Sequence, residues 1–314
     1  MQATEQPTWF FIVNPTAHNR GVKKQWPALE ARLREAMPGG MDVAYTQYAG
    51  HATQLAAKAV AAGYRRIVAV GGDGTNHEVT NGVLLQNHVP PAEVYYALFP
   101  IGTGNDWARH HGIPKKLNDW LAMIRKGNAI LQDVARVTYV DEQGRSQQRY
   151  GVNVVGLAYD AFVTHFAQRN KRWVWNRFFY MVLILRCLML YKLVKARVTA
   201  NGATWENRFY TINAGICKYS GGGLSLVPHA VADDGLLAVT LGGPLSKLGV
   251  ILNTYRFYNG TIGDHPKIDT FQAKEMVVEA VHESPIYVEA DGEMLGQTPV
   301  AIHIVEKALR IIVP

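Results

Sequence analysis

Cysteine is scarce in this chain of 314 residues, which contains only Cys187 and Cys217. Two cysteines so far apart provide neither the framework of a disulfide-rich protein nor the paired spacing of a zinc site. We therefore expect both to be buried core thiols, in a protein of the reducing cytoplasm.

Long apolar runs are also missing. The most apolar window, residues 178–194, has Arg186 at its centre and is shorter than the roughly 20 residues that a membrane-spanning helix needs. Residues 1–15 do not combine a basic start with an apolar stretch. We therefore expect neither a spanning helix nor a signal peptide.

Acidic residues are outnumbered: 32 lysines and arginines face 25 aspartates and glutamates, a net charge of +7. This excess predicts an anionic partner such as a nucleotide, a nucleic acid or an acidic membrane surface. Nucleic acid is disfavoured because the basic residues form no run and no nucleic-acid motif occurs. Hydrophobic residues make up 48% of the chain and charged residues 18%, which is typical of a folded protein.

The first part of the chain alternates strand-like and helix-like segments. Apolar segments at 9–15, 66–70 and 94–102 predict strands, the first of them stopped by Pro15, and a further strand is expected near 41–48. Helices are predicted between them by apolar spacing, at 22–37, 51–63, 75–85 and 117–127. Such alternation with short links predicts a parallel sheet covered by helices on both faces.

The pattern changes near residue 132. Hairpins are expected around Gly144 and at Asn201-Gly202, a pair that suits a type I′ turn, and short strands follow to the C-terminus. A single helical stretch, about 172–194, lies between the hairpins. This half of the chain predicts an antiparallel β-sandwich.

The predicted fold class is therefore α/β plus all-β, in two domains. We expect the α/β domain to span residues 1–134 and to be completed by a C-terminal strand at 303–314. The β-sandwich would span residues 135–302.

Two strand-to-helix junctions have an unusual composition: "GGDGT" at 71–75 and "GTGND" at 102–106. Ligands of open α/β sheets lie beyond the carboxyl ends of the strands, where unpaired helix N–H groups favour an anion. Two such loops at neighbouring strand ends would form one phosphate cradle. The alternative is two ordinary glycine turns with capping residues.

Within the cradle, we expect Gly71, Gly72 and Gly74 to bend the backbone through positive φ and to admit a phosphate. Thr75 would cap the helix or donate to a phosphate oxygen. Asp73 would repel phosphate unless Mg²⁺ lay between them. The cradle would be neither a Walker A loop nor a Rossmann dinucleotide loop, because neither signature is present.

The ordered set "GGDGTNHEVTNGV", "PIGTGNDWAR", "GVNVVGLAYDAFV", "GGGLSLVPHAVADDGLLAV" and "DGE" resembles the diacylglycerol kinase catalytic family. These bacterial soluble lipid kinases also include sphingosine kinase relatives, and the resemblance covers nearly the whole chain. The first loop alone is shared with NAD kinases and phosphofructokinases. The resemblance implies an N-terminal domain of that fold type, with ATP in a cleft between it and the sandwich.

The resemblance also implies which residues bind the nucleotide. Positions in the first loop, after the second strand and in the two glycine loops match the family's pattern: Asn14, Pro15, Thr46, Gly71, Gly72, Asp73, Gly74, Thr75, Asn76, Glu78, Gly102, Thr103, Asn105 and Asp106. His77 is unusual for the family, and we interpret it as a helix-surface residue.

Two further sites are implied in the second domain. "VPHAVADDGLL" matches a structural magnesium loop, with the Asp234 side chain and the carbonyls of Val231 and Leu236 as ligands; the alternative is a simple Asp-Gly turn. "EADGEML" matches the catalytic segment, with Asp291 as general base and Glu293 assisting or binding magnesium. The two acids would share a face if the chain were extended through Gly292; a hairpin turn is the alternative, and Glu293 could itself be the base.

Lipid access is expected along residues 168–195, where basic side chains alternate with Trp173 and Trp175. Basic residues attract anionic lipids and tryptophan favours the bilayer interface. In the alternative interpretation, this helix only caps the sandwich. The basic residues concerned are Arg169, Lys171, Arg172 and Arg177.

The sequence thus predicts a lipid kinase of phospholipid metabolism that uses ATP and Mg²⁺, with a diacylglycerol-like substrate. We expect it to be cytoplasmic and to contact an anionic membrane peripherally. We expect no binding to nucleic acid, and a homodimer is one of the oligomeric states left open. Two alternatives stay open: a non-lipid small-molecule kinase of the NAD kinase type, and a non-catalytic module that binds lipid or nucleotide.

Overall fold

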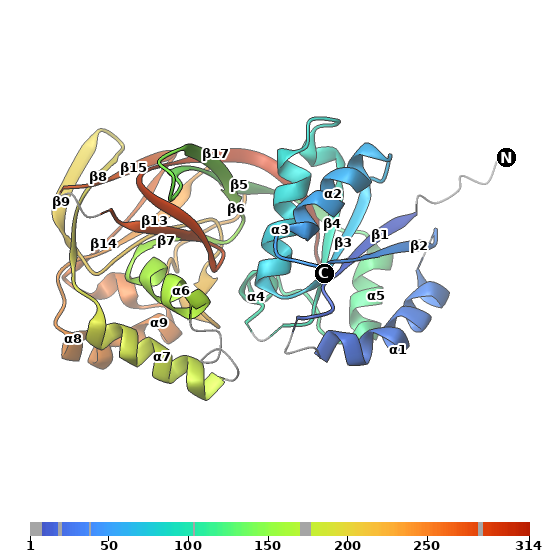
Figure 1. The fold of residues 1–314 in the computed structure, drawn as a ribbon, viewed down its shortest axis with the longest axis horizontal. Helices are drawn as coiled ribbons and strands as arrows, with labels where there is room; N and C mark the ends of the chain where they lie inside the picture. Colours follow the sequence, from blue (N-terminus) through green and yellow to red (C-terminus); the bar gives the residue numbers. More distant parts are fainter. Residues whose placement is uncertain (1–7, 18–20, 38, 103, 170–176, 282–284) are drawn as a thin grey trace. The chain divides into compact units, whose positions relative to one another are not determined.

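The computed structural model describes residues 8–17, 21–37, 39–102, 104–169, 177–281 and 285–314. The chain divides into two units (Figure 1). The first unit comprises Met1–Asp133 and Lys307–Pro314, and the second comprises Val134–Glu306.

The first unit is built on a parallel sheet in the order β17–β4–β3–β1–β2. Strands β3 and β4 are buried along nearly their whole length, as expected where both faces of a sheet are covered. The bounds are β1 Trp9–Val13, β2 Met41–Tyr45, β3 Arg66–Gly71, β4 Tyr95–Pro100 and β17 Glu293–Ile312, of which Arg310 and Ile311 pair with β4.

Helices cover both faces of this sheet (Figure 1). On one face, Trp26 of α1 and Trp120 of α5 pack against Phe11, each with ring centroids 6.3 Å away. On the other face, the Tyr96 hydroxyl of β4 donates to Asn76 of α3. The helices are α1 Gly21–Ala36, α2 His51–Ala61, α3 Asp73–Leu85, the 3-10 turn η1 Pro91–Glu93, α4 Asp106–His110 and α5 Leu117–Lys126.

The second unit contains antiparallel strands in two layers that share β17 (Figure 1). One layer has the order β14–β13–β10–β7–β16–β17, and β17 then pairs with β15, which continues to β8 and β9. Strands β5 and β6 form a hairpin next to β17. The bounds are β5 Ala129–Val140, β6 Ser146–Gly151, β7 Val154–Ala158, β8 Val194–Ala200, β9 Ala203–Phe209, β10 Thr211–Gly215, β11 Tyr219–Ser220, β12 Leu224–Ser225, β13 Leu237–Gly242, β14 Ile268–Ala273, β15 Glu275–Ala280 and β16 Tyr287–Ala290.

The predicted fold class is confirmed: an α/β unit is followed by an antiparallel sandwich. The predicted turns are also present. Asn201 and Gly202 have φ values of 52° and 74°, which both residues of a type I′ turn require, and they connect β8 to β9. Cys187 and Cys217 are both buried free thiols.

The helices of the second unit differ from the prediction of a single stretch at 172–194. The structure has α6 Tyr159–Arg169, α7 Arg177–Leu190, α8 Lys247–Asn253, α9 Tyr255–Asn259 and the 3-10 turn η3 Ile262–Asp264. Helices α8 and α9 are short and apolar on both their inward and outward sides, so they lack the amphipathic period that marks a helix in a sequence. Within the described ranges, no helix combines the length and apolar character required to cross a bilayer.

Candidate functional site

The two glycine loops lie side by side in the first unit. Strands β3 and β4 are neighbours, with Gly71 in register with Pro100. A Cβ atom on Gly102 would lie 2.7 Å from the Cα atom of Gly72 and 2.6 Å from Oδ1 of Asn105. The loops therefore meet backbone to backbone, as the sequence predicted for neighbouring strand ends.

One of the two predicted reasons for the first set of glycines, a bend through positive φ, is wrong. Gly71, Gly72 and Gly74 do not have positive φ, and Gly72 is extended with φ −101° and ψ −162°. Close packing requires glycine instead at position 71, because a Cβ there would lie 2.3 Å from the Thr75 hydroxyl oxygen. Helix α3 also begins at Asp73 rather than at Thr75, so Thr75 lies inside the helix and does not cap it.

Asp73 joins the two loops. Its carboxylate accepts hydrogen bonds from the backbone N–H groups of Asn105, at 2.7 Å, and Asp106, at 2.9 Å. Burial, and then the nearby charge of Asp106, raise the pKa of Asp73 to about 6. Gly104 leaves room for this contact, since a Cβ there would lie 2.8 Å from Oδ2 of Asp73.

Residues after β1 and β2 extend the same edge of the sheet. Asn14 follows β1, and its Nδ2 donates to the Thr75 hydroxyl at 3.1 Å. Thr46 follows β2, and its N–H donates to the carbonyl of Val13 at 2.9 Å. Pro15 follows Asn14 directly and is partly exposed. The structure thus brings predicted nucleotide residues from four strand ends together; Thr103 lies outside the described residues.

Two other residues assigned to the nucleotide have partners within the protein. Asn76 is 1% exposed, and its Oδ1 accepts from the Tyr96 hydroxyl at 2.5 Å. Glu78 accepts from the N–H groups of Gly50 and Ala52 at 2.7 and 3.0 Å, which caps the start of α2. His77 is buried, contrary to the expected surface position, because α3 is enclosed along most of its length.

The sequence reasoning missed two polar side chains in the first unit. Gln132 is fully buried, and its Oε1 accepts from Nε1 of Trp107 at 3.0 Å. Asp133, also fully buried, accepts from the N–H of Lys307 at 2.6 Å and so holds the returning end of the chain. Buried polar groups with no surrounding motif leave little signal in one sequence.

In the second unit, the predicted catalytic acid occupies a tight turn. Asp291 and Gly292 have φ values of 56° and 86° and connect β16 to β17, with Ala290 opposite Glu293. The chain is therefore not extended through Gly292, so Asp291 and Glu293 do not share a strand face. Asp291 is 5% exposed and accepts from the N–H groups of Val152 and Asn153 at 3.1 and 2.8 Å.

Two acids that the sequence reasoning did not single out lie close to this turn. Glu289 is 2% exposed and accepts from the Gly292 N–H at 2.7 Å. Burial, and then the charges of Asp160, Asp291 and Glu293, raise the pKa of Glu289 well above its usual value. A Cβ on Gly156 would lie 2.4 Å from Oε1 of Glu289, so glycine makes room for the buried carboxyl.

Asp160, at the start of α6, accepts a short hydrogen bond from the Thr211 hydroxyl, and burial raises its pKa. With Glu289, Asp291 and Glu293 it forms an acidic cluster within the second unit. The alternation of acids at 289, 291 and 293 is a signal that could have identified Glu289.

The predicted magnesium loop is a turn whose carboxylate has protein partners. Asp234 accepts from the N–H of Leu236 at 3.0 Å and from Nε2 of Gln272 at 2.8 Å. Val231 is exposed. These two contacts are those of an ordinary turn, and the magnesium site stays a prediction.

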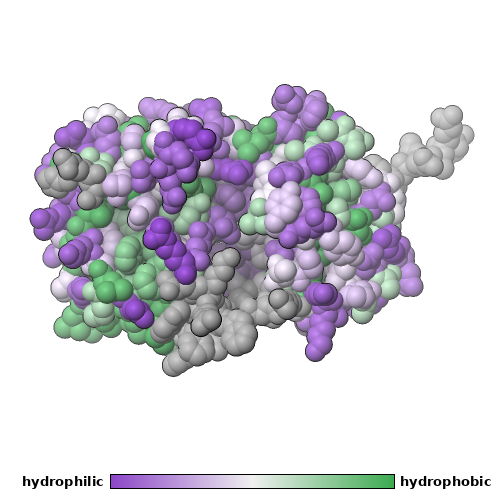
Figure 2. Space-filling view, viewed as in Figure 1, coloured by the Kyte–Doolittle hydropathy of each residue, from purple (hydrophilic) through white to green (hydrophobic). Residues whose placement is uncertain are grey.

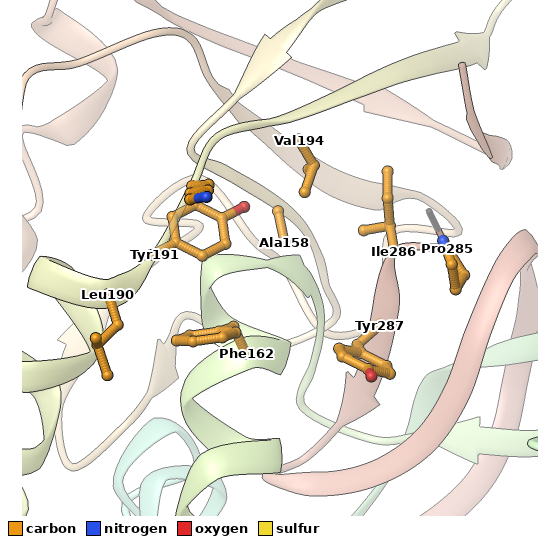
Figure 3. Close-up of a pocket in the computed structure, with 9 residues that line it drawn as sticks. Ala158, Phe162, Leu190, Tyr191, Val194, Pro285, Ile286 and Tyr287 are labelled. Atoms are coloured by element: carbon orange, nitrogen blue, oxygen red, sulfur yellow. The ribbon is translucent and has the colours of Figure 1, made fainter. Parts of the chain in front are cut away.

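The second unit also contains an apolar cavity of about 250 Å³ (Figure 3). The rings of Phe162 and Tyr287 lie along one side, and Tyr191 and Leu190 lie at the end of α7 (Figure 3). Lys192 supplies the only charged side chain among the lining residues of this cavity. The other lining residues are Ala158, Val194, Pro285 and Ile286.

The expected lipid-access segment is only partly described. Lys171, Arg172, Trp173 and Trp175 lie outside the described residues, as does the side chain of Arg177. Arg169 ends α6 and is exposed. Leu183, Cys187 and Leu188 of α7 are buried, and the Tyr159 hydroxyl of α6 donates to the carbonyl of Ile184, so one side of α7 packs within the second unit.

Family models match almost the whole chain. Residues 8–137 match the diacylglycerol kinase catalytic domain, and residues 153–313 match the YegS C-terminal NAD kinase beta sandwich-like domain. A diacylglycerol kinase of Staphylococcus carnosus (strain TM300) is 27% identical over 92% of this chain and 89% of its own length.

Solved structures show the same fold. A crystallised protein of Bacillus anthracis str. Sterne, assigned as a diacylglycerol kinase, aligns with a TM-score of 0.77 and 23% identity over 99% of this chain and 96% of its own. Yeast NADH kinase, crystallised with NADH, aligns with a TM-score of 0.50 and 9% identity over 99% and 84%.

Proposed function

The chain belongs to the diacylglycerol kinase catalytic-domain family, and on this premise we propose that it transfers the γ-phosphate of ATP to a lipid hydroxyl. A diacylglycerol-like lipid is the proposed acceptor. One observation carries the nucleotide half of the proposal: two glycine loops packed together at adjacent strand ends and joined by Asp73.

In this proposal, the first unit holds the triphosphate at the carboxyl ends of β1 to β4. Glycines allow the phosphates to approach the backbone, and loop N–H groups provide hydrogen-bond donors. Asn14, Thr46, Asp73 and the loop at 102–106 would provide the contacts. Mg²⁺, when bound, would neutralise phosphate charge during transfer.

The donor set of the first unit fits Mg²⁺. Asp73 and Asp106 offer hard carboxylate oxygens, and each is held close to the other despite their like charge. A divalent cation would offset that repulsion. We propose Asp73 and Asp106 as the carboxylates that hold it, and Asp234 with the carbonyls of Val231 and Leu236 as a separate structural site.

Asp291 is proposed as the general base. The N–H groups of Val152 and Asn153 hold its carboxylate in place, and a carboxylate can take a proton from the attacking hydroxyl. Removing that proton makes the oxygen a better nucleophile toward the γ-phosphorus; the bond to ADP breaks as the new P–O bond forms. Glu293 would assist.

The apolar cavity favours a lipid acceptor over a small polar one. Its lining of Phe162, Leu190, Val194 and Ile286 offers an acyl chain an environment that excludes water. A polar substrate such as a dinucleotide would gain little there. This cavity supports the proposal of a lipid kinase over the alternative of an NAD kinase type.

A transfer assay with labelled ATP tests the proposal. The full chain would be incubated with Mg²⁺ and separately with dioctanoylglycerol, a sphingoid base, phosphatidylglycerol, a polyprenol and NAD⁺. We expect labelled product with a lipid, and loss of nearly all activity in Asp291→Asn. Asp269→Asn, on exposed β14, is the matched control. Transfer to NAD⁺ alone would support the small-molecule kinase, and no transfer to any acceptor would support a non-catalytic module.

A further inference from the structure

An unusual apolar stripe lies on the outward side of α8 and α9. Thr254 between the two helices has helical φ and ψ values of −57° and −32°, so they are nearly continuous. The spacing of the stripe is that of one helix face. Its residues are Leu248, Ile251, Leu252, Tyr255 and Tyr258, which are 43–65% exposed.

The inward side of the same helices is also apolar. Val250 is 9% exposed, and Phe257 packs against the small core around Leu226 and Val227. The core therefore already has its apolar partners from α8 and α9, and the outward stripe is additional. Contiguous exposed apolar surface of this kind marks an interaction site on a folded protein.

Helix α7 extends this apolar surface. Met181, Leu185 and Met189 recur every four residues and are 44–53% exposed. The Nζ of Lys247, at the start of α8, donates to the carbonyl of Met189, so the two helices are adjacent. Hydrophobic residues gather over α8 and α9 in Figure 2. We name the exposed apolar residues of α7, α8 and α9 the docking face.

Basic residues predominate in the segments that carry the docking face. Residues 161–205 contain no aspartate or glutamate, and neither do residues 235–263; exposed Asp264 follows in η3. Exposed Arg186 and Lys192 belong to the first stretch, and exposed Lys247 belongs to the second. An apolar surface with basic residues around it matches the apolar interior and anionic headgroups of a bilayer.

The docking face also continues into the apolar cavity. Leu190 is 52% exposed at the end of α7 and lines that cavity (Figure 3). A lipid that leaves a bilayer at this face could therefore place an acyl chain in the cavity without crossing polar surface. A second protein copy would not require this continuity or this charge.

We propose that the docking face binds an anionic lipid bilayer, with the stripe of α8 and α9 inserted at the level of the headgroups. Part of this inference, the transfer of an acyl chain to the cavity, rests on the proposed function. Binding of the bilayer itself requires neither nucleotide nor catalysis, so it can be tested separately.

Flotation of the full chain with vesicles tests the proposal. Vesicles of phosphatidylglycerol and phosphatidylcholine would be compared with vesicles of phosphatidylcholine alone, at low salt and without nucleotide. We expect binding to the anionic vesicles that weakens about tenfold or more in the double variant Leu248→Gln, Leu252→Gln, because two inserted leucines are lost. Glutamine preserves helix propensity, and thermal unfolding would check the fold.

Leu85→Gln is the matched control, since Leu85 is 42% exposed at the end of α3 in the first unit. It should bind vesicles as the wild type does. Equal binding by the double variant and the wild type would overturn the proposal. So would a wild type that binds no vesicles, or a dimer in analytical ultracentrifugation that the double variant converts to a monomer.

The two proposals fail differently. A protein that floats with anionic vesicles through the docking face but phosphorylates no acceptor would overturn only the proposed function. A protein that phosphorylates water-soluble dioctanoylglycerol but whose vesicle binding is indifferent to Leu248 and Leu252 would overturn only the docking face.

Discussion

Asp73 and Asn105, from loops that follow different strands, are joined by a hydrogen bond of 2.7 Å from the Asn105 N–H to the Asp73 carboxylate. The acid of the first glycine loop therefore shapes the second loop. Asn105 itself has a left-handed backbone, φ 53° and ψ 49°, at the start of α4. The Asp73 side chain, which the sequence suggests only as a ligand of phosphate-bound Mg²⁺, therefore also has a structural role.

The raised pKa of Asp73 makes stability depend on pH. Its pKa is about 6 in the folded protein and 3.8 in the unfolded chain, so folding binds a proton between these values and stability falls as the pH rises from 3.8 to about 6. Asp73→Asn has no carboxyl group to titrate, so its stability does not fall in this way. Between pH 4 and pH 7, the free energy of unfolding of the variant should therefore rise by on the order of 1–3 kcal/mol relative to that of the wild type.

Urea unfolding of both proteins at several pH values measures this difference. The variant loses part of the contact with the N–H groups of Asn105 and Asp106, which lowers its stability equally at every pH. Parallel curves for the two proteins would therefore contradict the prediction. Asp269→Asn, far from any glycine loop in sequence, should follow the wild type.

Gly102 should not tolerate a methyl group. A Cβ there would lie 2.7 Å from the backbone of Gly72, so Gly102→Ala should separate the loops and cost about 1–3 kcal/mol of unfolding free energy. Gly72→Ala is the matched control, because its Cβ would lie 3.4 Å from Gly102, an ordinary contact. Thermal unfolding compares them; an equal loss in both variants would show that packing of the loops is not the cause.

Glu289 should hold its proton to a higher pH than the exposed glutamates do. Burial and the surrounding carboxylates raise its pKa well above the usual value, so one glutamate carboxyl carbon should keep its protonated chemical shift after the exposed glutamates have ionised. Carbon NMR with labelled glutamate would detect this signal, which should vanish in Glu289→Gln and remain in Glu279→Gln, an exposed site on β15. If all glutamate carbons lose their protonated shift over the same pH range, the prediction is wrong.

Filling the cavity should discriminate between acceptors. Val194→Phe introduces a ring among the lining residues, so KM for a long-chain diacylglycerol should rise about tenfold while dioctanoylglycerol is affected less. Val277→Phe, on exposed β15, changes the same residue type outside the cavity. An unchanged preference for chain length would place the acyl chains elsewhere.

Local pattern was sufficient for much of the fold. Strand β3 is an apolar run because both faces of its sheet are covered, and this burial is visible in the sequence as "RIVAV". Asn201-Gly202 specifies its turn through the backbone preferences of two residues. By contrast, α8 and α9 are apolar on two sides, and local pattern does not predict which side meets the core.

Local sequence pattern predicted only part of the candidate site. The composition of the first glycine loop identified Gly71 and Asp73, and the family resemblance identified Asp291. The structural reasons for those residue types are contacts with Thr75, Asn105 and Asn153. Glu289 was missed because its unusual property, a raised pKa, depends on neighbours from other segments, including Asp160.

By itself, the sequence determined the alternation of strands and helices in the first unit, the hairpin turns and the two glycine loops, because each depends on residues that are close along the chain. Tertiary structure alone decided that Asp73 ties one loop to the other, that Asp291 lies in a turn against Val152 and Asn153, and that the stripe of α8 and α9 faces outward. These features depend on contacts between distant segments, and such contacts form only when the whole chain packs.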